Sequence, residues 1–89
     1  MENFKKLIKH MDDTLDEAYQ YLIDSIHIAN SDPKLSSCYL KMSKSHLDMF
    51  DQFLEHLKSL NNIDKSILDF EHSRLMSKFY SINYTLSSQ

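Results

Sequence analysis

The sequence predicts an all-α fold of three long antiparallel helices in an up-down-up bundle. Apolar residues recur every three or four positions through three stretches, glycine is absent, and the single proline stands in one of two short polar breaks. Because both breaks are short, sequential helices should be antiparallel neighbours. A chain of 89 residues cannot divide its apolar side chains between two cores, so we expect residues 1–89 to form one domain.

The first helix is expected over about residues 3–30. Its apolar seam consists of Phe4, Ile8, Met11, Leu15, Ala18, Leu22, Ser25 and Ala29. The break that follows holds Asn30, which can take the left-handed conformation that ends a helix. Asp32 can then cap the second helix, and Pro33 suits its first turn.

The second helix is expected over about residues 33–60 and the third over about 64–84, with Asp64 as a cap. The seam of the second helix consists of Leu35, Tyr39, Met42, His46, Met49, Phe53, Leu57 and Leu60. The seam of the third consists of Leu68, His72, Leu75, Phe79 and Ile82, with Leu86 as an extension. At ~1.5 Å per residue the first two helices would reach about 40 Å, which predicts a rod.

A second apolar stripe lies on the second helix at Leu40, Leu47 and Leu54, rotated by roughly 100° from the seam. In one interpretation this helix lies between the other two and contacts both. In the other, one stripe is a surface for a partner or a second copy. Leu40, Leu47 and Leu54 are therefore candidate interface residues.

Aromatic and aliphatic side chains beside the seams are further interface candidates. They are Tyr21 and Ile28 on the first helix and Phe70, Tyr80 and Tyr84 on the third. Tyrosine suits a surface with one wet edge, and exposed aromatic groups commonly anchor interfaces. Since a rod of three helices buries little surface per residue, we expect a homo-oligomer and a protein partner.

The charge balance argues against nucleic acid as a partner. The net charge is −3 and Arg74 is the only arginine, whereas a nucleic-acid binder needs a basic face. No apolar run is long enough for a membrane span or a signal peptide. A lone cysteine, Cys38, fits a reducing compartment, so we expect a cytoplasmic protein that does not bind membranes.

An acidic patch occupies the first helix at Asp12, Asp13, Asp16 and Glu17. Carboxylates four residues apart repel each other, so a cation or a basic partner would relieve the patch. A plain solvated helix face is the alternative.

Two histidines lie near the centres of apolar seams, His46 on the second helix and His72 on the third. Each is either a core histidine held by a hydrogen bond or a metal ligand. A metal site would use His46, His72 and Glu71, and we expect no cofactor. His56 with Lys58 has a partial likeness to a histidine phosphotransfer helix, but the lysine stands two positions on, away from the histidine's face.

Three motifs between residues 11 and 60 resemble small phage- and prophage-encoded ferritin-like helical hairpins. They are Asp16-Glu17-Ala18-x-x-Tyr21, Asp32-Pro33-x-Leu35 and Tyr39-x-x-Met42-Ser43-x-x-His46-Leu47. The resemblance implies a ferritin-like hairpin for the first two helices. Ferritin-like metal sites use a Glu-x-x-His motif on the second helix. Here Ser45 or His46 stands where the glutamate belongs and Met49 where the histidine belongs, so the metal ligands are not retained.

The sequence therefore favours a non-enzymatic module that self-associates and binds a protein. A phage accessory protein, or an antagonist of a host system, would fit the resemblance. The alternatives are a ferritin-like metal-binding protein and a histidine phosphotransfer-like protein. No catalytic motif is present: the absence of glycine removes phosphate-binding loops, and the sequence shows no base beside Cys38.

Overall fold

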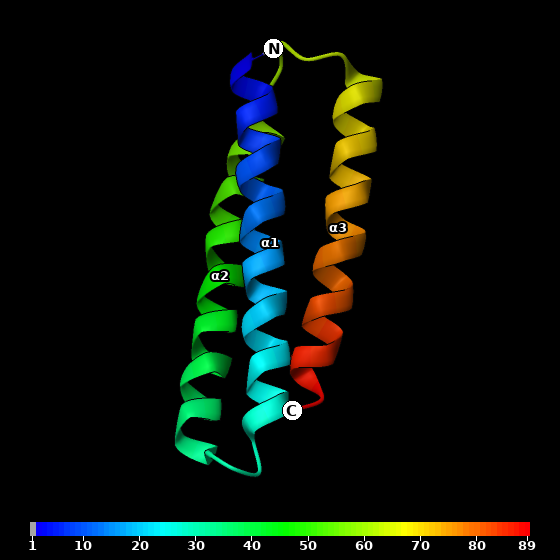
Figure 1. Cartoon of the computed structure of the whole chain (residues 1–89). Helices are drawn as coiled ribbons and strands as arrows, with labels where there is room; N and C mark the ends of the chain where they lie inside the picture. Colours follow the sequence, from blue (N-terminus) through cyan, green and yellow to red (C-terminus); the bar gives the residue numbers. More distant parts are fainter. Residues whose placement is uncertain (1) are drawn as a thin grey trace.

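A computed structural model describes residues 2–89 and consists of three long α-helices. They are α1 (Glu2–Ile28), α2 (Pro33–Ser59) and α3 (Lys65–Ser87). The chain runs down α1, up α2 and down α3, so that sequential helices are antiparallel (Figure 1). The extents are 49 × 19 × 15 Å, which confirms the predicted rod.

Each of the two polar breaks in the sequence separates two helices, largely as predicted. Asp32 caps α2 by accepting a hydrogen bond from the Leu35 amide at 3.1 Å, and Pro33 is the first helical residue. Asp64 caps α3 through the Ser66 amide at 2.9 Å. The left-handed conformation expected at Asn30 is wrong: no residue from 2 to 89 has a positive φ. Instead, the amides of Ser31 and Asp32 donate to the Ile28 carbonyl and close α1 two residues early.

The closest packing is between α1 and α2. Ser43 is fully buried, and its hydroxyl donates to the Ala18 carbonyl at 2.7 Å. Nearer the turn, the Ser25 hydroxyl donates to the Ser36 carbonyl at 2.8 Å, and the Ser36 hydroxyl donates to the Ser25 carbonyl at 2.7 Å. Small side chains at these positions let the two backbones approach, so α1 and α2 form a tight hairpin.

The third helix packs more loosely than the other two. Leu75, Ile82 and Leu86 are its buried residues, and the Phe79 ring stacks on Phe50 of α2 at 5.3 Å between centroids. In Figure 1, α3 stands apart from α2 over most of its length. The core is therefore centred on the α1–α2 hairpin, with α3 as a lighter third layer.

Most of the seam predicted for α1 is buried, but Ile8 is half-buried and Ala29 is exposed beyond the end of the helix, and the seam predicted for α2 is largely wrong. Phe4, Met11, Leu15, Ala18, Leu22 and Ser25 are buried on α1. On α2 the buried residues are Ser43, Leu47, Phe50, Leu54 and Leu57. Of the predicted α2 seam only Leu57 is buried, while Met42 and Met49 are 41% and 44% exposed.

Candidate interaction surfaces

The partly exposed side of α2 carries a row of uncharged side chains along almost the whole helix. We call it the outer row of α2, and it consists of Leu35, Met42, His46, Met49 and Phe53 on the helix and Leu60, the residue that directly follows its last turn. Leu35, Met42 and Met49 are each at least 40% exposed. At ~100° per residue, the charged residues Lys44, Asp48, Asp51, Glu55 and Lys58 fall on the far side of the helix, whereas Lys34 and Lys41 fall beside the row, roughly 90–110° from its centre. The outer row is thus an apolar surface with no charge of its own.

Aromatic side chains fix the border between this row and α1. The Tyr21 ring lies 5.3 Å from His46 and 5.9 Å from Tyr39, measured between centroids. His10 of α1 stacks near Phe53 at 6.4 Å. The His46 ring also has its Nδ1 2.9 Å from the Met42 carbonyl oxygen. These contacts pack the rings of the row against α1.

The leucine stripe at positions 40, 47 and 54 lies in the core of the single chain. Leu47 and Leu54 are 5% and 7% exposed, and Leu40 packs against the same core cluster. Leu47 and Leu54 are therefore not accessible in the single chain, contrary to what an interface stripe would need, whereas Leu40 is half-buried. A helix that packs against both α1 and α3 needs these leucines within its own chain, which is the other interpretation of the stripe.

The outward side of α3 carries exposed aromatic residues. Phe70, Tyr80 and Tyr84 are 66%, 62% and 78% exposed. Residues 79–89 contain no charged side chain. Tyr21 and Ile28, the α1 interface candidates, are both half-buried. The exposed apolar side chains are thus divided between the hairpin and α3.

The acidic patch of α1 meets basic residues of its own chain. Arg74 donates from Nη1 and Nη2 to both carboxylate oxygens of Asp12, at 2.9 and 2.7 Å. Lys78 reaches Asp12 and Asp16, each at 2.9 Å. Asp13 pairs with Lys9 along α1, and Glu17 is exposed. Two of the four carboxylates, Asp12 and Asp16, therefore attach α3 to α1.

These ion pairs shift the pKa values of the side chains that form them. The Arg74 guanidinium, followed by Lys78, holds the pKa of Asp12 below its ordinary value despite partial burial. Burial lowers the pKa of Lys78, but its pairs with Asp12 and Asp16 outweigh burial and leave that pKa raised. Arg74, bonded to Asp12 and Glu71, has a raised pKa as well. All of these shifts favour the charged forms and thus the docked α3.

The candidate metal ligands are not brought together. His46 lies beside Tyr21, His72 lines a small cleft with Leu57, and Glu71 accepts from Arg74 Nη2 at 2.7 Å. Among residues 2–89, no three His, Cys, Asp or Glu side chains form a cluster that could hold a metal ion. Neither histidine is fully buried, so the core-histidine interpretation is not met in full either.

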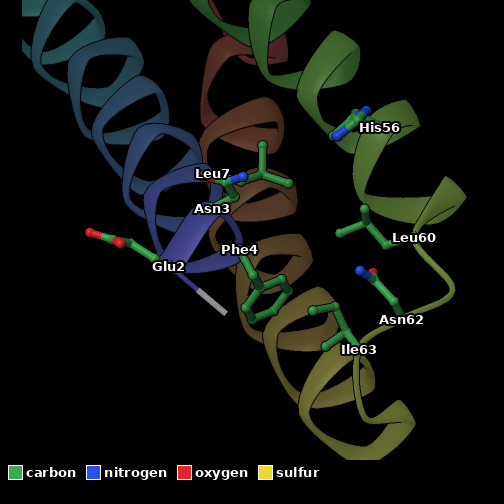
Figure 2. A pocket seen from close by; sticks show the side chains of 8 residues that line it. All are labelled: Glu2, Asn3, Phe4, Leu7, His56, Leu60, Asn62 and Ile63. Carbon is green, nitrogen blue, oxygen red and sulfur yellow. The ribbon is translucent and has the colours of Figure 1, made fainter.

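An open cleft of about 380 Å³ lies where the start of α1 meets the end of α2 (Figure 2). Phe4, Leu7, Leu60 and Ile63 supply its apolar lining, and His56 lies at its edge. In Figure 2 the carboxylate of Glu2 points away from the other lining side chains. Lys58 lines a different cleft, between α2 and α3, so it does not accompany His56. The pairing that a phosphotransfer site needs is therefore absent here.

A second cleft, of about 560 Å³, lies between the middle of α2 and the end of α3. Leu40, Leu47, Phe79 and Leu86 line its floor, and Asp51 is among the polar residues that also line it. This opening follows from the loose packing of α3.

Over the part of the chain that the structure describes, no helix combines the length and apolarity needed to cross a membrane.

Sequence reasoning missed the outer row as a surface, because its residues were assigned to the core. The sequence did contain a signal for this surface: the row holds a histidine and two methionines, whereas the stronger apolar residues Leu47, Phe50 and Leu54 lie on another side of the helix.

Comparison of the chain with family models, curated proteins and solved structures finds no match, so the ferritin-like resemblance rests on its three sequence motifs alone.

Proposed function

We propose that this chain is a non-enzymatic interaction module that self-associates and binds a protein partner. The observation that supports this most strongly is the number of large apolar side chains left at the surface of a small rod. They include Leu35, Met42 and Met49 on α2 and Phe70, Tyr80 and Tyr84 on α3. Water contact with this much uncharged surface is unfavourable, and association removes it.

The two surfaces suit different roles in this proposal. The outer row of α2 is apolar and ordered by ring contacts, which suits a permanent contact. Tyr80 and Tyr84 are more exposed and offer hydroxyl groups, which suits a partner bound reversibly. A cytoplasmic accessory protein of a phage, or an antagonist of a host system, is the setting that the sequence resemblance supports.

The proposal is tested on the full chain purified without a metal-chelating tag. Light scattering gives the mass of the particle, and iron, manganese and zinc are assayed in the same fraction. We expect a metal-free particle with a mass that is a multiple of 10.6 kDa. A monomer with stoichiometric metal would overturn self-association and favour the metal-binding alternative.

The partner-binding part is tested separately by a Tyr80→Ala/Tyr84→Ala variant. Both side chains are mostly exposed, so we expect unchanged helix content and thermal stability. Once a binding protein has been identified, truncating such anchors should weaken its affinity by about 2 kcal/mol or more, or roughly 30-fold. Binding that is unaffected by both truncations would remove α3 from the interface.

A further inference from the structure

The outer row of α2 has a spacing that reads the same in both directions. Leu35, Met42, His46, Met49, Phe53 and Leu60 follow one another at intervals of 7, 4, 3, 4 and 7 positions. The centre of this pattern lies between His46 and Met49. A helix face with such a pattern matches its own copy when the copy runs in the opposite direction.

We propose that the outer row of α2 pairs antiparallel with the outer row of a second copy about a two-fold axis. This rests on the proposed function and names the self-association surface. The axis places Leu35 opposite Leu60, Met42 opposite Phe53, and His46 opposite Met49 of the second copy. Each contact then occurs twice, as a two-fold interface requires.

The same two-fold axis also places the α1 helices of the two copies opposite each other. The hydrogen bonds from Ser43 to Ala18 and between Ser25 and Ser36 fix the register of α1 against α2. In that register the axis brings Glu17 level with His10 of the second copy. Lys6 comes level with Tyr21 of the second copy. The two copies of Asp13 come within about one residue of each other beside the axis, and each remains paired with Lys9 of its own helix at 2.7 Å.

A second copy fits this surface better than a charged partner does. The outer row has no charge to offer such a partner, and its own copy is equally uncharged. At ~1.5 Å per residue and a helix diameter of ~10 Å, α2 with its α1 flank covers roughly 600 Å² per copy. That area lies at the lower end of specific interfaces, which bury about 1,200 Å² or more in total. The pairing would leave α3 and its tyrosines free.

Charge insertion tests the surface directly. Glutamate at Met42 or Met49 would place a carboxylate in the paired rows, whereas Tyr80→Glu makes the same change on α3. All three residues are at least 41% exposed, so the single chain should keep its helix content by circular dichroism. We expect Met42→Glu and Met49→Glu to raise the dimer dissociation constant at least about tenfold. Tyr80→Glu should leave it unchanged.

Engineered cysteines test the direction of pairing in a Cys38→Ala background. At ~1.5 Å per residue, two copies of residue 49 stand about 5 Å apart along the helix, and two copies of residue 35 about 38 Å apart. Met49→Cys should therefore form a disulfide-linked dimer under mild oxidation, and Leu35→Cys should not. Cross-linking of both positions would indicate parallel pairing and overturn the antiparallel assignment.

Failure of this inference can be distinguished from failure of the proposed function. A wild-type dimer that survives both methionine substitutions but is lost in Tyr80→Glu would move self-association to α3 and overturn the α2 pairing. The proposed function would then stand. A wild-type chain that stays monomeric at high concentration would overturn self-association and the α2 pairing together.

Discussion

Ser43 shows how a polar residue comes to occupy the centre of this core. Its hydroxyl is satisfied by the Ala18 carbonyl, and its small volume lets α1 and α2 approach each other. A larger apolar residue would be more hydrophobic and yet fit worse, because no free space adjoins a fully buried position.

We therefore expect Ser43→Leu to destabilise the chain by about 1–3 kcal/mol through overpacking. Ser43→Ala, which loses only the hydrogen bond, should cost about 1 kcal/mol. Urea unfolding monitored by circular dichroism measures both values. A Ser43→Leu variant as stable as the wild type would contradict the close packing of the hairpin.

Asp12 gives the attachment of α3 a dependence on pH. Its pKa is lowered in the folded chain from the ordinary 3.8, so its contribution is fully present above about pH 4. That contribution is lost as the pH falls through the lowered folded value. Lys78, with a pKa raised from 10.5, contributes below that pH and loses its contribution as the pH rises through its folded value.

Asp12→Asn should accordingly cost about 1 kcal/mol at pH 7, the range for partly exposed ion pairs. Between pH 5 and pH 3 the variant should lose less stability than the wild type, because its side chain cannot be protonated. Thermal unfolding midpoints of both proteins over this pH range make the comparison. Identical losses would mean that Asp12 does not stabilise the docked α3.

At the scale of the helices, α3 is the element with the weakest attachment. It buries three residues and relies on exposed or half-buried ion pairs, whereas α1 and α2 share the closest packing. Amide hydrogens of α3 should therefore exchange with solvent before those of the hairpin. Exchange at one common rate across all three helices would show a single cooperative unit instead.

An inserted charge should destabilise the chain far more on the core side of α2 than on the outer side. Leu47→Glu would bury a carboxylate in the core and cost more than about 3 kcal/mol. Met49→Glu on the same helix, 44% exposed, should cost the single chain about 1 kcal/mol or less. Denaturant unfolding at low protein concentration separates the two. Equal costs would mean that the core and outer sides of α2 are assigned wrongly.

Much of the helical architecture could be predicted from the sequence, because capping residues and apolar spacing are local signals. Asp32, Pro33 and Asp64 mark helix starts in both sequence and structure. The core side of α2 could not be predicted, since apolar residues cover two adjoining sides and Ser43 reads as polar. The pairing of Asp12 with Arg74 spans 62 positions, so no local pattern contains it.

The molecule as a whole is a hairpin with a loosely attached third helix, and it leaves uncharged surface exposed on two of its elements. Serine hydrogen bonds and apolar packing join α1 to α2, and ion pairs attach α3 to α1. The apolar surface that the sequence predicted in surplus is present, but it lies on the outer row of α2 and on α3. The role in contact with other chains that we propose rests on this distribution.

Sedimentation equilibrium of the full chain, from about 1 µM to 1 mM, tests self-association most directly, because area alone does not set affinity. Our account predicts that the apparent mass rises from 10.6 kDa towards twice that value. A mass that stays at 10.6 kDa over the whole range would contradict it.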